Sequence, residues 1–482
     1  MQYPLLMANS ADSDKSTMWR VRVPSSLDES ARVAADRRAV SLSTFIRDSV
    51  ASQLTLNGGT GNASQAAPSR APKPQRLTMV SLFTGAGGLD VGLDATGRFD
   101  LLATVELQET FCKSLRRNQA KGLLGTPDTR VIQADLSTYT PQQLMAELGI
   151  EPGELDVLVG GPPCQSFSTA GRRAGVQDPR GQLIWSYLNF VRELRPKVFL
   201  MENVRGLLSA ALEHRPIAQR PSNGGMLLRP EEQPGSVFDL WLSDALDIGD
   251  GEYRVDTFEV NAVNYGAPQL RERVLVFGNR LDRVTPYLAP THAQNDEELP
   301  PYRTLRTALD GLKEACPVLL DFSPRKKAFL DLVPPGGNWR SLPDEVASES
   351  MGRAFHAKGG RSGWWRRLSW DLPSPTITTM PNHSSTSMCH PEETRVLSVA
   401  ECARTQEFPD EWEFLGSVAE QMKQVGNAVP TRLGRVAGEA IVRIIEDESL
   451  GSDDTPRATQ TYVKSHVRTR RWWHDGHAVI QV

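Results

Sequence analysis

Short apolar runs recur between residues 77 and 279, and the stretches between them space their apolar residues as amphipathic helices do. The runs are 79–83, 101–105, 131–132, 155–159, 198–201 and 274–277. Strand-sized runs that alternate with helices predict a doubly wound α/β fold with a mostly parallel sheet. Ligands bind at the carboxyl ends of the strands in such sheets, so the residues after each run are the first candidates for a site.

Elsewhere this alternation is lost. Residues 280–390 are irregular, with four tryptophans among Arg, Pro and Gly residues, and predict a second, smaller domain. Residues 208–250 are polar with Gly, Pro and Ser clusters, which predicts a surface excursion of no assigned function. Residues 55–76 are rich in Gly, Ala, Ser and Pro and predict a flexible linker after an N-terminal unit, residues 1–54. The basic tail, 451–482, contains tryptophan and could contact nucleic acid or cover a surface.

The N-terminal unit has the order strand, helix, helix. Its strand alternates Arg20 and Arg22 with apolar residues, and two helices capped by serines follow it. This order resembles a ribbon-helix-helix DNA-binding domain, in which the strands of two chains pair and enter the major groove. The resemblance implies a homodimer in which Arg20 and Arg22 face the bases. The alternative is a small helical module that binds protein.

Composition narrows the class of protein. No apolar run approaches the roughly 18 residues of a membrane span, and the N-terminus lacks the pattern of a secretory signal, so we expect a cytoplasmic protein. The five cysteines are odd in number and none lies in a C-x-x-C pair, which argues against a disulfide framework and against a four-cysteine zinc site, so we assign no metal ligands. The net charge of -4 means that any nucleic-acid contact depends on local patches.

The first run leads into a glycine-rich turn, with the sequence SLFTGAGGLD at 81–90. Glycines let a ligand approach the backbone closely, and free N–H groups at the start of a helix favour an anionic group. A dinucleotide-binding G-x-G-x-x-G pattern from Gly85 would need a glycine where Asp90 stands, so a nicotinamide cofactor fits poorly.

Acidic residues follow the next two runs. Glu106 comes after the second, about 20 residues beyond Gly85, where a carboxylate can accept hydrogen bonds from ribose hydroxyls. Asp135 follows the third run. Either acid alone could be a helix cap or a solvated loop residue, but the glycine turn beside them favours a ligand site.

A cysteine and a carboxylate follow two further strands. Cys164 lies just past the run 155–159, in the rigid Pro-Pro loop GGPPCQSFS. An isolated cysteine is more often a small buried apolar residue than a nucleophile. Glu202, however, ends the run 198–201 and should reach the same edge of the sheet, which favours a catalytic pair.

Together these segments resemble the DNA cytosine-5 methyltransferase family over most of residues 77–447. The motifs, in the family's order, are SLFTGAGGLD, GGPPCQSFS, ENVRG (202–206), QLRER (269–273), RVLS (395–398) with Glu401, Arg404, Gln406, Phe408 and Pro409, and QVGNAVP (424–430). The resemblance implies a catalytic domain of residues 77–279 plus 413–450 and a target-recognition domain of residues 280–412. It implies S-adenosylmethionine as cofactor, duplex DNA as substrate and a cognate restriction endonuclease as partner.

The resemblance also implies catalytic roles. Cys164 would add to C6 of a flipped cytosine, because C5 is too weak a nucleophile to take the methyl group unaided. Glu202 would act as the acid near N3. Arg273, with Arg271, would hold the base's carbonyl or the loop that carries Cys164, although scaffolding is the alternative for both arginines.

Cofactor and DNA contacts follow from the same resemblance. Phe83 and Pro162 would line the adenine, Glu106 would bind the ribose, Asp135 the adenine amine, and Asn427 would lie near the methionine end. The remaining cofactor residues would be Thr84, Gly85, Gly87, Gly88 and Leu136. The residues expected to touch DNA are Arg172, Arg173, Thr376 and Ile377.

Two other functions stay open. One is a DNA-binding regulator whose methyltransferase domain is inactive, which the N-terminal unit would suit; that unit could also repress the protein's own promoter. The other is an RNA cytosine-5 methyltransferase. The DNA-type N-terminal unit and the long recognition region favour DNA.

Overall fold

The computed structural model describes residues 75–163, 182–294, 296–357, 361–451 and 455–463, together with the short strands β9 (Trp473–His474) and β10 (His477–Ala478). The chain divides into two units, Met1–Lys73 and Pro74–Val482, and the described residues belong to the second. The predictions for the N-terminal unit and for five residues lie outside the described residues. The five are Arg20, Arg22, Cys164, Arg172 and Arg173.

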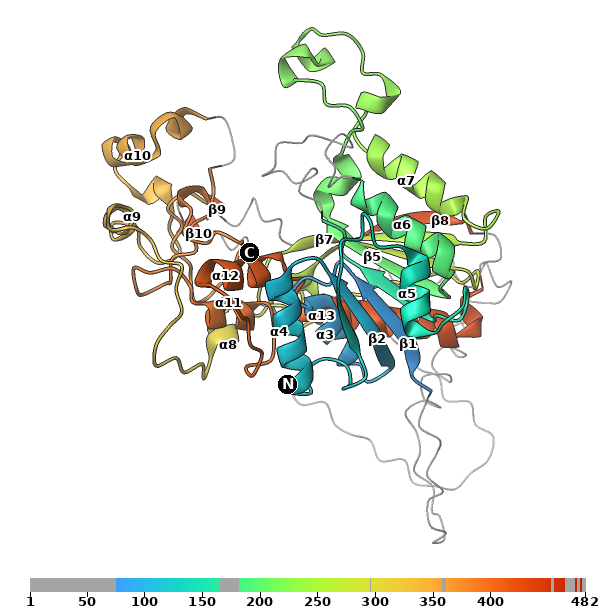
Figure 1. The fold of residues 1–482 in the computed structure, drawn as a ribbon. Coiled ribbons are helices and arrows are strands. Elements are labelled where there is room, and N and C mark those ends of the chain that lie inside the picture. Colours follow the sequence, from blue (N-terminus) through green and yellow to red (C-terminus); the bar gives the residue numbers. More distant parts are fainter. Residues whose placement is uncertain are drawn as a thin grey trace, which may run out of the picture. The chain divides into compact units, whose positions relative to one another are not determined.

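A single eight-stranded sheet forms the centre of the second unit, in the order β3-β2-β1-β4-β5-β7-β6-β8 (Figure 1). Its strands are β1 (Leu77–Leu82), β2 (Phe99–Glu106), β3 (Arg130–Gln133), β4 (Val157–Gly160), β5 (Val198–Val204), β6 (Arg254–Asn261), β7 (Glu272–Asn279) and β8 (Ala458–Tyr462). Strands β1 to β5 are parallel, and β7 runs antiparallel to β5 and β6. The predicted doubly wound, mostly parallel sheet is confirmed.

Helices cover both faces of this sheet (Figure 1). On one face lie α3 (Gly88–Asp94), α4 (Glu109–Ala120) and α13 (Thr431–Glu446), and on the other α5 (Pro141–Leu148), α6 (Leu183–Leu194) and α7 (Ser236–Leu246). Alternate strand residues enter the two cores: Met79 and Val157 face α3 and α13, whereas Val80 and Leu158 face α6.

Helix α13 returns to the sheet from the end of the chain and packs closely on α3. A Cβ atom on Gly92 would lie 2.0 Å from the Thr431 carbonyl oxygen, and one on Gly434 would lie 2.2 Å from that of Leu89. Only glycines permit this approach of the two backbones. The residues that follow the irregular region therefore complete the core around the first strands.

The irregular region contains short helices joined by loops. They are α8 (Leu305–Leu309), α9 (Pro324–Leu330) and α10 (Asp344–Met351), and two more helices, α11 (Val399–Thr405) and α12 (Val418–Asn427), follow this region. Buried arginine side chains form hydrogen bonds with backbone carbonyl groups in this region. Arg367 donates from Nε to the Val333 carbonyl oxygen at 2.8 Å and from Nη2 to the Leu330 carbonyl oxygen at 2.8 Å. Such bonds satisfy loop carbonyls that would otherwise be buried unpaired.

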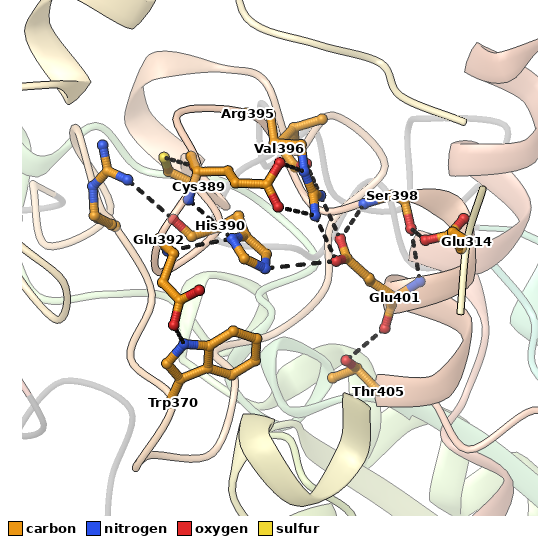
Figure 2. A network of polar contacts seen from close by, with 12 residues as sticks. Glu314, Trp370, Cys389, His390, Glu392, Arg395, Val396, Ser398, Glu401 and Thr405 are labelled. Atoms are coloured by element: carbon orange, nitrogen blue, oxygen red, sulfur yellow. Dashed lines mark hydrogen bonds and ion pairs between the residues drawn. The ribbon is translucent and has the colours of Figure 1, made fainter. Parts of the chain in front are cut away.

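A second polar network fixes the start of α11 (Figure 2). Arg395 forms two bonds to Glu401, with Nη1 to Oε2 at 2.7 Å and Nη2 to Oε1 at 2.9 Å, and the Ser398 N–H donates to Glu401 Oε2 at 2.7 Å. His390 places Nε2 3.7 Å from the same carboxylate, and burial lowers its pKa. The motif residues Arg395 and Glu401 therefore act as scaffolding.

Within the described residues, no helix combines the length and apolar character that crossing a membrane requires. The same residues hold no cluster of three or more His, Cys, Asp or Glu side chains that could bind a metal ion.

Candidate active site

The glycine turn after β1 is braced by Glu106 at the end of β2. The Gly85 N–H donates to Glu106 Oε2 at 2.9 Å, and the Gln108 N–H donates to Oε1 at 2.9 Å. Glu106 is buried, and burial raises the pKa of its carboxyl group. The backbone N–H of Leu107 also bonds this carboxylate. Three backbone donors leave one of its roughly four lone-pair sites, so Glu106 can hold the turn and still accept a ligand hydroxyl.

The turn also touches the end of α12. A Cβ atom on Gly88 would lie 2.2 Å from the Val429 carbonyl oxygen and 3.3 Å from the Ala428 Cβ atom. The structure thus brings together the glycine motif and the segment containing Asn427, which is exposed at the last position of α12. Gly87 caps the start of α3 with a φ of 80°, a conformation that favours glycine.

The strand order aligns the other predicted cofactor residues along one edge. Because β3, β2, β1 and β4 are neighbours and parallel, the residues after them follow in the order Asp135, Glu106, the glycine turn and Pro162. Asp135 is exposed, and its Oδ1 accepts from the Ser137 hydroxyl at 2.7 Å, which lowers its pKa. Leu136 is buried.

Phe83 and Thr84 shape the beginning of the turn. Phe83 has a φ of 53°, packs against the core on the α6 face of the sheet and remains partly exposed. Thr84 is buried and donates from its hydroxyl to the Ser81 carbonyl oxygen at 3.2 Å. Thr84 therefore supports the turn from the buried side, whereas Phe83 is the aromatic residue at its partly exposed side.

Glu202 and Arg273 form an ion pair at the end of β5. Arg273 Nε lies 2.7 Å from Glu202 Oε1, and the two side chains are 11% and 10% exposed. Glu202 is opposite Leu275 in the ladder, so Arg273, two residues earlier on β7, lies on the same face. This pairing places a fixed carboxylate at the edge of the sheet.

The loop that leads to Cys164 lies against this carboxylate. A Cβ atom on Gly161 would be 3.3 Å from Glu202 Oε2, and Asn203 Nδ2 donates to the Pro162 carbonyl oxygen at 3.2 Å. In the described residues, the loop that leads to the predicted nucleophile therefore contacts Glu202, the predicted acid, and its neighbour Asn203. Asn203 was missed by sequence reasoning, although it immediately follows Glu202.

Arg271 occupies a different place from the one expected. It is 2% exposed and donates to the carbonyl oxygens of Ile377 and Gly426, each at 3.0 Å. Gln269 joins the same network by accepting from the Ile377 N–H at 3.0 Å. The expectation that Arg271 holds the base's carbonyl is not matched by this arrangement, because its guanidinium is directed at backbone carbonyls far apart in the sequence.

The same network encloses one of the predicted DNA contacts. The Ile377 side chain is 1% exposed, so the expectation that it touches DNA does not hold in this structure. Thr376 is partly exposed, but its hydroxyl donates to the Leu270 carbonyl oxygen at 2.7 Å. The Thr376–Ile377 pair thus fastens the irregular region to the segment just before β7.

Asp90 is a buried carboxyl group that sequence reasoning left without a role. It is 0% exposed, and its burial outweighs a hydrogen bond with the Ser81 side chain. Burial raises its pKa to about 6. Its position in the first turn of α3 places it beneath the glycine turn.

Comparison with known proteins gives consistent matches. The family model for C-5 cytosine-specific DNA methylases matches residues 77–443. The chain is 34% identical over 375 residues to the type II methyltransferase M.Sau96I of Staphylococcus aureus, covering 77% of each chain. It is 35% identical over 385 residues to M.Eco47II of Escherichia coli, covering 77% of this chain and 79% of the relative.

A third relative, M.PspPI of Psychrobacter sp. (strain TA137), is 36% identical over 385 residues, with 78% of this chain and 81% of the relative covered. Among solved structures, a prophage-encoded DNA modification methyltransferase from Escherichia coli aligns with a TM-score of 0.51 and 23% identity. That alignment covers 77% of this chain and 100% of the other. It supports the fold.

Proposed function

The chain belongs to the C-5 cytosine-specific DNA methylase family, and from this we propose how its own residues methylate cytosine C5 in duplex DNA. The methyl donor of the family is S-adenosylmethionine. The observation that carries the proposal is the Glu202–Arg273 pair beside the loop that leads to Cys164.

The residues at the glycine turn fit this cofactor. The turn exposes backbone beside Asn427, Glu106 keeps a lone-pair site for a ribose hydroxyl, and the partly exposed Phe83 would line the adenine. When bound, the cofactor supplies a methyl group on a sulfonium. Asp135 and Pro162, on the neighbouring strand ends, would complete the adenine site.

Catalysis on this proposal begins with Cys164. Its thiolate sulfur forms a bond to C6 of the flipped cytosine, and the displaced ring electrons make C5 nucleophilic. Glu202 places a proton at N3, where negative charge would otherwise accumulate. Arg273 keeps the Glu202 carboxyl in position through its Nε atom. Once C5 carries the methyl group that a bound cofactor would supply, loss of the C5 proton and of the Cys164 thiolate, with return of the N3 proton to Glu202, restores the aromatic ring. No residue is assigned as the base that takes the C5 proton.

Arg271 would act as a positioning residue. By bonding to Ile377 and Gly426 it joins the recognition region to the cofactor side of the sheet. On this proposal residues 280–412 read the DNA sequence, and the catalytic domain comprises 77–279 and 413–450. Loop residues Arg172 and Arg173 would contact phosphates.

The biological setting proposed is restriction-modification in the cytoplasm. The relatives named above are type II methyltransferases at 34–36% identity, which supports a cognate restriction endonuclease as partner. The ribbon-helix-helix-like unit would bind DNA as a homodimer through Arg20 and Arg22, either at the protein's own promoter or to raise affinity for the substrate.

The test is transfer of labelled methyl to duplex DNA by wild type and by Cys164→Ala, with bisulfite sequencing of the product. We expect 5-methylcytosine in one sequence context with wild type and none with the variant. A wild-type protein that labels RNA but not DNA would support the RNA alternative. One that labels neither, yet binds an operator through residues 1–54, would support the regulatory alternative.

A further inference from the structure

Helix α12 exposes one face along its length. Lys423 and Asn427 lie four residues apart on this ten-residue helix, and both are exposed, as is Ala419 one turn earlier. Residues 424–426 are buried. Residues four apart lie on the same face of a helix, so Lys423 and Asn427 belong to one exposed stripe.

The two ends of α12 fix where this stripe lies. At the start of the helix, the Thr110 hydroxyl donates to Glu420 Oε1 at 2.8 Å and joins α12 to the first turn of α4 (Figure 1). At its end, the Val429 carbonyl lies against Gly88 of the glycine turn. Because α4 begins just after Glu106, the stripe runs from the Glu106 side of the candidate site to the glycine turn.

The Lys423 ammonium group is held beside this site. Its Nζ atom lies 5.8 Å from the centre of the Phe111 ring, in the first turn of α4, a contact that attracts a cation only weakly. Burial raises the pKa of the Glu106 carboxyl group, and the charge of Lys423 offsets a part of this rise. Within the part of the chain that the structure describes, no carboxylate lies within ion-pair distance of Nζ. The ammonium therefore keeps donors for a ligand.

Two backbone donors of the glycine turn are already used by the protein itself. The Gly85 N–H donates to Glu106 at 2.9 Å, and the Gly87 N–H donates to the Thr84 carbonyl oxygen at 3.0 Å. The N–H groups that the sequence led us to expect for an anionic group are thus partly engaged. A side-chain cation close to the turn can supply the attraction that these two groups do not.

The charges of the cofactor select the group that Lys423 meets. S-adenosylmethionine has one anionic group, the methionyl carboxylate, and Asn427 is expected at the methionine end. An ammonium bonds more strongly to a carboxylate than to a neutral hydroxyl. Glu106 is an acceptor and suits a ribose hydroxyl, whereas Lys423 is a donor and suits the carboxylate.

We propose that Lys423 binds the methionyl carboxylate of S-adenosylmethionine, one helical turn from Asn427. The proposal rests on the function proposed above and names a further residue of that site. Glu106 then holds the ribose and Lys423 holds the carboxylate, so the sulfonium that lies between these two groups is fixed from both sides. Lys423 is thus a binding residue that positions the methyl group.

The test measures binding by calorimetry, with S-adenosylmethionine and with its decarboxylated analogue, to full-length wild type and Lys423→Met. Methionine keeps an apolar side chain over Phe111 and removes the charge. For S-adenosylmethionine we expect the dissociation constant of the variant to be about tenfold higher, the effect of one charged hydrogen bond. For the decarboxylated analogue the substitution should not raise the dissociation constant, because the group that Lys423 binds is missing. Lys113→Met, at an exposed residue of α4 that pairs with Glu109, is the matched control and should bind both ligands as wild type does.

An equal rise for both ligands would overturn the proposal, because Lys423 would then act through Glu106 or through the fold. An unchanged dissociation constant for S-adenosylmethionine would overturn it as well. So would a loss confined to duplex DNA, measured by fluorescence anisotropy, with a smaller salt dependence, since Lys423 would then be a phosphate contact. Failure of the proposed function is distinct: wild type would bind the cofactor with the expected pattern and yet transfer no methyl group to DNA.

Discussion

Arg273 Nε lies 2.7 Å from Glu202 Oε1, and the two side chains come from adjacent antiparallel strands with only about a tenth of their surface exposed. Because both side chains are largely removed from water, the contact with Arg273 is what holds the Glu202 carboxyl group in place. The pair fixes the orientation of Glu202 before any substrate arrives. This preorganisation is what a catalytic carboxyl group requires, since a reorienting acid would add to the barrier.

Replacing Glu202 by glutamine should abolish most activity while preserving the fold. The amide has the same shape but cannot supply a proton to N3, so we expect the single-turnover rate to fall by about 10²-fold or more. Binding of S-adenosylmethionine should not change. The control is Glu439→Gln, on the exposed face of α13. A variant that retains wild-type turnover would show that Glu202 is only structural.

Arg271→Lys should weaken the link between the recognition region and the cofactor side. A lysine keeps the charge but loses the planar fork that reaches Ile377 and Gly426 together. We expect the free energy of unfolding to fall by roughly 2 kcal/mol, a value typical of charged hydrogen bonds, and KM for DNA to rise. Chemical denaturation and steady-state kinetics provide the two measurements. Unchanged values in both would contradict the positioning role.

Much of the sheet was predictable because its strands are short apolar runs bounded by turns. Strand β6 was missed because it buries polar residues: Arg254 and Asp256 are each 1% exposed and pair at 3.1 Å. Asp256 also accepts from the Thr459 hydroxyl on β8 at 2.6 Å, and β8 comes from the basic tail, in which no strand was expected. Polar residues that satisfy one another across strands leave no apolar pattern to detect.

The site was predictable only where motifs follow strands. Glu106 and Glu202 stand at strand ends, where the fold concentrates ligand contacts. The contacts of Arg271 with Ile377 and Gly426 span 106 and 155 residues, and no local pattern encodes them. The enclosure of Ile377 was unforeseen for the same reason, because its burial depends on Gln269 and Arg271.

Asp90→Asn should stabilise the protein near neutral pH. The pKa of Asp90 is raised from 3.8 to about 6 by burial, so its protonated form favours the folded state. That stability is complete below pH 3.8 and is lost as pH rises through 6, at a cost of about 3 kcal/mol above it. Asparagine carries no charge, so its advantage should be largest above pH 7 and should shrink towards pH 4.

Thermal unfolding of wild type and Asp90→Asn across this pH range measures the effect. Glu439→Gln, at an exposed residue, serves as the control and should show no comparable trend. If the two Asp90 forms differ by the same amount at every pH, the carboxyl group is not the source of the difference.

Gly88→Ala should impair cofactor binding, because the new Cβ atom has no room. It would lie 2.2 Å from the Val429 carbonyl oxygen, which belongs to the backbone and cannot rotate away. Either the glycine turn or the segment after Asn427 must shift, and both belong to the proposed cofactor site. We expect the dissociation constant for S-adenosylmethionine to rise about tenfold, since small misplacements of binding groups cost factors of this order or more.

The matched control for this substitution is Gly451→Ala, because nothing lies within 4 Å of the added atom and its φ is not in the left-handed region. Calorimetric titration with S-adenosylmethionine separates binding from turnover, and thermal unfolding reports any general loss of stability. If Gly88→Ala binds the cofactor as the control does, the close approach of the turn to Val429 has no part in the cofactor site, and the assignment of Asn427 to that site loses its structural support.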